Sequence, residues 1–280
     1  MNSVRPPLDR ELILAGLSPD VRCWVRELGV HLQIDSTNTH LMTLASVGDI
    51  DGVVCVAEHQ TKGRGRRGRT WLTPPGGSIA LSLGKHIAVA IAEVAPLSLV
   101  VGLAVANALD QSGVDGVSLK WPNDVLLDGA KVGGILIELA SITLPLKMVI
   151  GVGINVGAGT EVSARLGIPV GDVLTKDGKI SRNDFVAELI NNICDLTMAF
   201  ELQGFSPMRS DWEALHAHQD RRVLLIGANE MIEGVALGVT ENGELMLDTA
   251  SGIRHFSGGE VSLRGEHGRD LPAFFGPTVT

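Results

Sequence analysis

The apolar and polar positions of this 280-residue chain change their spacing several times, and each spacing predicts an element. Residues 52–59 (GVVCVAEH) and 147–157 (KMVIGVGINVG) are nearly continuous apolar runs, as in buried strands. Residues 78–84 (SIALSLG) alternate, which predicts another strand. The segments VSLKW, VLLDG and KVGGILIEL also read as strands, with Asp128-Gly129 as a hairpin turn.

Towards the N-terminus, the pattern predicts a helix within residues 9–30 and then a short strand at Leu32 and Ile34. A second helix follows at DSTNTHLMTLAS, where Asp35 or Ser36 can cap the first turn.

Two longer helices are expected further along. Residues 93–112 form a long apolar helix that ends before a glycine. Residues 180–203 are amphipathic, and Ser181 with Asp184 resembles a capping box. A short helix is then expected around Trp212.

After about residue 218 the pattern changes to five short strand candidates. Turn signals separate them at Gly227-Ala228-Asn229, Asn242-Gly243 and Ser251-Gly252. This spacing predicts a small antiparallel barrel. We therefore expect a larger domain over residues 1–217, a barrel over 218–264 and a tail over 265–280.

Composition narrows the class of protein. The chain carries a net charge of −9, its N-terminus has no apolar signal segment, and its most apolar stretch, residues 94–106, is too short to span a bilayer. Cys23, Cys55 and Cys194 are too far apart for a zinc motif or a disulfide framework, which favours a cytoplasmic protein with buried or inert cysteines. The eight histidines show no ligand spacing, and His216 with His218 is weak evidence for a metal.

The stretch TKGRGRRGRTW at residues 61–71 places five cations and three glycines within eight residues. Its cations are Lys62, Arg64, Arg66, Arg67 and Arg69. Arginines donate in pairs to phosphate or carboxylate, and glycines let the backbone approach a ligand closely. Trp71 offers a flat face for a ring. A solvated basic loop is the alternative interpretation.

Two nucleotide-binding motifs are approached here but lack their context. GRGRRG matches the glycine spacing of a dinucleotide site, yet no helix follows and no acid lies near residue 85. A phosphate-binding P-loop would need a lysine where Arg69 stands and a helix after it.

Five motifs occur in order: DSTN at 35–38, AEHQTKGRGRRGRTW at 57–71, LKWPNDVLLDGAKVGGILIE at 119–138, GVGINV at 151–156 and GGEVSLR at 258–264. Over residues 32–264 the set closely resembles biotin protein ligases. The resemblance implies an α+β fold, with a mixed β-sheet flanked by helices, of the class II synthetase-like type, and a small SH3-like β-barrel after it. It also implies that biotin and ATP, with Mg²⁺, give biotinoyl-5′-AMP, and that biotin then passes to a lysine of a biotin carboxyl carrier domain, as in acetyl-CoA carboxylase.

The resemblance assigns the site residue by residue. The biotin-binding set is Ser36, Thr37, Asn38, Gln60, Arg64, Gly65, Arg66, Lys131, Gly133 and Gly134. The ATP and adenylate set is Arg64, Arg66, Arg67, Arg69, Trp71, Lys120, Asn123, Asp124, Lys131 and Asn155. The catalytic residues are Lys131, Arg66 and Asp124, and no metal ligand is assigned.

Each assignment has a structural alternative. Residues 36–38 could merely cap a helix, Trp71 could belong to the core, and Lys131 could be a solvated turn residue. Asn123-Asp124 could be an ordinary turn and Asn155 a satisfied buried amide.

The resemblance also implies a partner and a moving loop. The expected partner is the carrier domain, with no nucleic acid or membrane, and the expected state is a monomer or homodimer. The loop at 62–70 is expected to be disordered without ligand and to close over biotin and the phosphate. A lipoate–protein ligase is the nearest alternative, but its arginine pair, consecutive glycines and His-Asp do not occur here. A DNA-binding biotin sensor is disfavoured by the acidic charge and by the roughly 30 residues before Leu32, too few for a winged helix-turn-helix.

Overall fold

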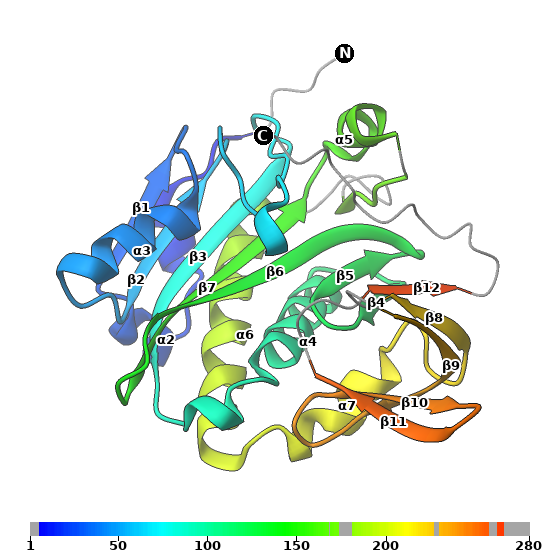
Figure 1. Cartoon of the computed structure of the whole chain (residues 1–280). Helices are drawn as coiled ribbons and strands as arrows, with labels where there is room; N and C mark the ends of the chain where they lie inside the picture. The colour runs from blue at the N-terminus through cyan, green and yellow to red at the C-terminus, as the bar shows by residue number, and fades with distance from the viewer. Residues whose placement is uncertain (1–5, 168, 174–180, 227–229, 258–261, 266–280) are drawn as a thin grey trace.

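A seven-stranded mixed β-sheet is the centre of the larger part of the molecule (Figure 1). The computed structural model describes residues 6–167, 169–173, 181–226 and 230–257, and the backbone of 262–265. In sheet order the strands are β1 (Glu27–His31), β2 (Val53–Ala57), β3 (Ser78–Ile87), β7 (Leu146–Asn155), β6 (Ala130–Ser141), β5 (Asp124–Leu127) and β4 (Val117–Lys120). β1 and β2 are parallel, and the other neighbouring pairs are antiparallel. This mixed sheet, with its helices, confirms the expected fold class.

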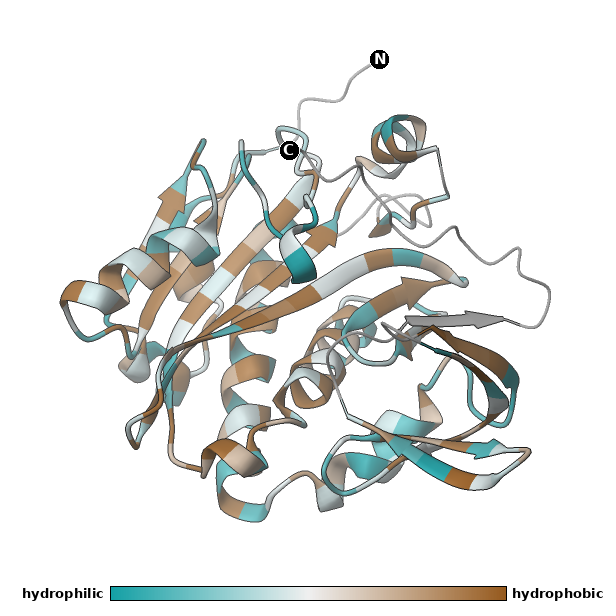
Figure 2. Cartoon of the chain, in the orientation of Figure 1, coloured by the Kyte–Doolittle hydropathy of each residue, from teal (hydrophilic) through white to brown (hydrophobic). Residues whose placement is uncertain are grey.

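Helices cover both faces of the sheet, which explains why the central strands are apolar almost throughout. α4 (Leu97–Gln111) and α6 (Arg182–Gln203) lie on one face and α3 (Thr37–Val47) on the other (Figure 1). Hydrophobic residues follow the central strands and α4, whereas the short turn η1 (Arg66–Gly68) is hydrophilic (Figure 2). Ser36 caps α3, and Ser181 caps α6 by accepting a hydrogen bond from the Asp184 amide, as predicted.

The N-terminal region differs from its prediction. Instead of one helix within residues 9–30, there are α1 (Arg10–Ala15), α2 (Pro19–Trp24) and then β1. The strand expected at Leu32 and Ile34 lies earlier, because the fully buried β2 needs a partner along its outer edge and finds it in β1. Leu32 itself is 78% exposed.

Several short helices connect these elements. α5 (Gly159–Leu166), which the sequence analysis did not predict, ends at Gly167 in the left-handed conformation, with φ of 70°. The single-turn helices η2 (Ile91–Glu93) and η4 (Ser206–Met208) precede α4 and α7 (Arg209–Ala214). Within the described residues, no helix has the length and apolar character needed to cross a membrane.

The C-terminal part is a five-stranded antiparallel sheet that packs beside α4 and α7. Its order is β11 (Gly252–Phe256), β10 (Leu245–Thr249), β9 (Met231–Val239), β8 (Arg222–Ile226) and β12 (Ser262–Gly265). The sheet is open, because its order ends at β11 and β12 without pairing them among the described residues. The expected small antiparallel domain is therefore confirmed, but as an open sheet and not as a closed barrel. The turn at 227–229 and the tail after 265 lie outside the described residues.

Candidate active site

A cavity of about 690 Å³ opens against the seven-stranded sheet. It is bounded by the first turn of α3, the glycine loop at 61–72, the β5–β6 hairpin and the segment after α7. The predicted residues that line it are Ser36, Thr37, Asn38, Gln60, Arg64, Gly65, Arg66, Arg67, Arg69, Trp71, Lys120, Asn123, Asp124, Lys131, Gly134 and Asn155. The structure thus brings residues from five distant segments into one space.

The first turn of α3 presents a buried polar network to this cavity. Ser36, Thr37 and Asn38 are 2%, 3% and 4% exposed, which is unusual for polar side chains. Gln60 Oε1 accepts hydrogen bonds from the Thr37 amide at 2.8 Å and its hydroxyl at 3.2 Å. Ser82 Oγ lies 2.8 Å from Thr37 Oγ1 and 2.6 Å from Asn38 Oδ1. The network fixes Thr37 and Asn38 before a ligand arrives, while Ser36 caps the helix and also lines the cavity.

Two arginines of the glycine loop are anchored across the cavity. Arg64 forms an ion pair with Glu138 on β6, with 2.8 Å between Nη2 and Oε1. Arg66 Nη1 donates to Asn123 Oδ1 at 3.0 Å. Burial lowers the pKa of Arg66, and neighbouring Arg67 contributes in the same direction. The loop holds several cations close together, which favours an anionic ligand.

The loop backbone makes a tight turn between these anchors. Gly65 N donates to Arg69 O at 2.7 Å, and Trp71 N donates to Gly63 O at 2.9 Å. Arg67 takes a left-handed conformation, with φ of 59°, which is uncommon for a residue other than glycine.

Lys131 and Asp124 form an ion pair at the floor of the cavity. Their Nζ and Oδ1 atoms are 2.6 Å apart, and their side chains are 20% and 23% exposed. The hairpin register pairs Asp124 with Gly134 and Leu126 with Lys131, with a bulge between Val125 and Leu126. The Lys131 side chain lies back over Gly134 towards Asp124, and a Cβ atom on Gly134 would make ordinary contact with it at 3.5 Å.

Trp71 lies flat between this pair and strand β7. Its ring centroid is 5.8 Å from Lys131 Nζ. A Cβ atom on Gly153 would lie 2.5 Å from Trp71 Nε1, so the ring needs a glycine beneath it. Trp71 Nε1 is buried and has no hydrogen-bond partner among the described residues. A buried donor of this kind costs free energy unless a ligand or water accepts from it.

The nucleotide half of the predicted site is held by amides. Asn123 Nδ2 donates to the Ile135 carbonyl at 2.8 Å, which orients its Oδ1 towards Arg66. Asn155 Nδ2 donates to Gly171 O at 3.3 Å, while its buried Oδ1 has no partner within the described part of the chain. Lys120 lines the same side of the cavity.

Gly133 does not line the cavity. A Cβ atom there would collide with the Ile154 side chain and lie 2.9 Å from Gly153 O, so this glycine serves the packing of β6 on β7. Strand alternation gives the reason, since Gly133 and Gly134 face opposite sides of the sheet.

Sequence analysis missed several residues of the site. Glu138 accepts from both Arg64 and Asn38 Nδ2, and Ser82 joins the network under α3. His216 and Arg221, which follow α7, also line the cavity. His216 was named only as weak evidence for a metal, and the others do not stand out in the sequence. Glu138 is the last residue of the motif at 119–138, so its charge could have suggested an ion pair with an arginine of the loop.

Comparisons with known proteins agree on one family. Residues 30–155 match the Biotin/lipoate A/B protein ligase family, and residues 218–264 match the Biotin protein ligase C terminal domain. The chain is 38% identical to a bifunctional ligase/repressor of Escherichia coli, over 82% of this chain and 72% of that protein. It is 35% identical to a biotin–[acetyl-CoA-carboxylase] ligase of Mycobacterium tuberculosis, over 92% and 96%. A biotin protein ligase of Aquifex aeolicus, solved with biotin and ATP, superimposes with a TM-score of 0.74 at 30% identity, over 86% of this chain and all of that one.

Proposed function

Because the chain belongs to the biotin protein ligase family, we propose that its cavity joins biotin to AMP and then passes biotin to a lysine of a biotin carboxyl carrier domain. One observation carries the proposal. A buried polar network, an arginine loop and a Lys–Asp pair meet in a single cavity large enough for a nucleotide and a small acid. MgATP enters as the substrate, so its metal ion arrives with the phosphates.

In the first step a biotin carboxylate oxygen attacks the α-phosphorus of ATP. The new O–P bond forms as the bond to the β-phosphate oxygen breaks, and pyrophosphate leaves. Both reacting groups are anions, so nearby cations must offset their repulsion. Lys131 and the arginines of the loop supply that charge, and the network at Ser36, Thr37 and Asn38 receives the polar ring of biotin.

In the second step the amine of the acceptor lysine attacks the acyl carbon of biotinoyl-AMP. An amide bond forms, the bond to the AMP oxygen breaks, and the amine loses a proton. We assign to Asp124, which lies beside Lys131, the role of orienting that amine or accepting its proton. The loop carrying Arg64 and Arg66 excludes water from the mixed anhydride between the two steps.

The test measures both half-reactions with purified protein. Biotin should drive exchange of labelled pyrophosphate into ATP, and a carrier domain should gain the mass of one biotinyl group. Lipoate in place of biotin should support neither, and calorimetry should show binding of biotin but not of lipoate. Exchange driven by lipoate, or adenylation without transfer to any carrier domain, would contradict the proposal.

A further inference from the structure

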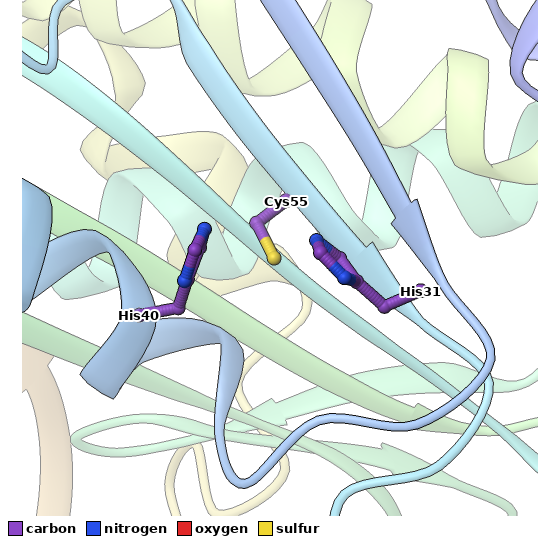
Figure 3. A group of neighbouring side chains, drawn as sticks. All are labelled: His31, His40 and Cys55. Carbon is purple, nitrogen blue, oxygen red and sulfur yellow. The ribbon is translucent and has the colours of Figure 1, made fainter.

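His31, His40 and Cys55 meet away from the cavity, although they lie far apart in the sequence (Figure 3). One ligand atom of each, an imidazole nitrogen or the thiol sulfur, lies within 4.8 Å of the other two. His31 ends β1, His40 is in the second turn of α3, and Cys55 is at the centre of β2. None of the three lines the cavity.

The parallel pairing of β1 and β2 creates this meeting point. Gly29 is directly opposite Cys55 in the register, and His31 follows two residues later on the same face. A Cβ atom on Gly29 would lie 3.0 Å from His31 Nε2, so the His31 ring occupies the space above that glycine. The glycine thereby directs the ring towards Cys55, on the face that α3 covers.

The two imidazoles have few other interactions to explain their position. Their ring centroids are 5.5 Å apart at an interplanar angle of 64°, and neither ring forms a hydrogen bond with a described residue. Both side chains are only partly buried, so solvent reaches the cluster. Cys55 is 1% exposed and faces the apolar side chains of Leu41 and Val149.

A metal ion at the cluster would meet a neutral His31 imidazole and a protonated Cys55 thiol. Burial, with a contribution from His40, lowers the pKa of His31, so that ring offers a neutral nitrogen at physiological pH. Burial and the carboxylates of Asp35 and Glu27 raise the pKa of the Cys55 thiol to about 12. A metal ion that binds here must therefore displace the thiol proton, which makes binding stronger as the pH rises.

We propose that His31, His40 and Cys55 form a binding site for a borderline-soft divalent cation of the Zn²⁺ class. Imidazole nitrogen and thiolate sulfur are the ligands that Zn²⁺ prefers, at about 2.0–2.3 Å in a tetrahedral arrangement. On binding, two nitrogen–metal bonds and one sulfur–metal bond form and the thiol proton passes to solvent, while water takes the fourth position. The required convergence is about 1 Å, which rotation of two partly exposed imidazoles can supply.

Co²⁺ is the probe, because its tetrahedral complexes have strong visible bands and a thiolate ligand adds a near-ultraviolet charge-transfer band. Chelator-treated protein should bind one equivalent of Co²⁺ with both signals, and Zn²⁺ should displace it. Cys55→Ala should remove the charge-transfer band. His40→Gln should weaken Zn²⁺ binding by more than the roughly 10–100-fold that loss of a residue supporting a metal ligand costs. Zn²⁺ should also raise the Tm of the native protein, since it ties α3 to β1 and β2.

Two control variants keep the test specific. Cys55 and Cys194 are buried, whereas Cys23 is exposed and is the cysteine at which adventitious metal binding must be controlled for. Cys23→Ala should leave the Co²⁺ spectrum unchanged, as should His255→Ala, whose imidazole is half-exposed. His40→Gln changes a partly exposed position and should fold, so the loss of a ligand can still be measured if Cys55→Ala folds poorly. Absence of the one-equivalent site, its loss in Cys23→Ala, or its persistence in His40→Gln would overturn the proposal.

Discussion

Gly153 leaves room for the Trp71 ring because it has no side chain. Substituting Gly153 therefore tests whether the position of that ring matters for adenylation. We expect Gly153→Ala to push the ring off β7, because the new Cβ atom would lie 2.5 Å from Trp71 Nε1. Overpacking of this size costs about 1–3 kcal/mol, so biotin-dependent pyrophosphate exchange should fall at least about fivefold.

Gly102→Ala is the matched control for that substitution. A Cβ atom on Gly102, within α4, would make ordinary contacts at 3.6–3.8 Å. Its exchange activity should match that of the native protein, and its stability should rise by about 0.5–1 kcal/mol, since alanine is the better helix former. Full activity in Gly153→Ala would show that the Trp71 position is unimportant for adenylation.

Lys131 and Asp124 should separate the two half-reactions, even though they are paired in the structure. Lys131→Ala should abolish exchange, because it removes the cation beside both reacting anions. Asp124→Asn should retain much of the exchange and slow transfer from preformed biotinoyl-AMP, since an acceptor lysine with a pKa of about 10.4 must lose a proton to attack. Lys147→Ala, remote from the cavity on β7, is the control for loss of a lysine. If Asp124→Asn loses exchange and keeps transfer, Asp124 acts on the metal or nucleotide instead.

At the residue scale, the sequence motifs identified residues that line the cavity, but they did not identify the residues that support them. Lys131, Asn123 and Asp124 stood in a recognisable stretch, and the structure brings them together. Gly153 and Ser82 could not be identified, because their importance depends on which residue of a neighbouring strand or helix stands over them. Register across a sheet is not visible in one sequence.

The glycine loop at 61–72 is the element for which we predict a change of state on ligand binding. Two of its arginines have partners outside the loop: Arg64 pairs with Glu138 on β6, and Arg66 donates to Asn123 in the turn before β5. Biotin plus ATP should slow tryptic cleavage between Lys62 and Arg69 by at least about tenfold, which corresponds to about 1.4 kcal/mol of loop stabilisation. Mass spectrometry of the fragments would identify the cut bonds, and lipoate plus ATP should give no protection. Equal cleavage with and without biotin plus ATP would contradict loop closure.

Helices and strands were predicted well where the hydrophobic pattern extends over many residues. They were predicted poorly where a segment becomes a strand only by pairing with another strand. The strands β2, β3 and β7 and the helices α4 and α6 match their predicted segments closely. β1 was assigned to a helix, because residues 27–31 become a strand only through their pairing with β2. α5 has only eight residues, so its periodicity extends over too few positions to identify a helix from the sequence.

On the scale of the whole molecule, the small sheet is tied to the larger part beside the cavity. Trp121, at the end of β4, is 1% exposed and donates from Nε1 to Gly243 O at 2.9 Å. Leu119 N donates to Leu215 O at 2.7 Å, which draws the segment after α7 along β4. The cavity therefore takes His216 from a segment about 85 residues beyond Lys131, a distance that no local motif could anticipate.

His216 links this arrangement to the pH dependence of folding. Burial lowers its pKa from 6.5 to about 4, although Gln219, Glu213 and Asp220 act in the opposite direction. Its ring lies 4.8 Å from that of Trp212, and its buried Nε2 has no hydrogen-bond partner in the described residues. The unfolded chain thus binds the proton more tightly than the folded one does. The contribution of neutral His216 to the free energy of unfolding is therefore fully present above pH 6.5 and is lost as the pH falls from 6.5 towards 4. At about 1.4 kcal/mol per pH unit, the loss in the free energy of unfolding amounts to about 3 kcal/mol.

Urea unfolding at a series of pH values should show this decrease in the free energy of unfolding for the native protein and a smaller decrease for His216→Leu. His255→Ala, which removes a half-exposed imidazole, should keep the native slope. If His216→Leu and the native protein lose stability equally between pH 6.5 and 4, buried His216 is not the group responsible.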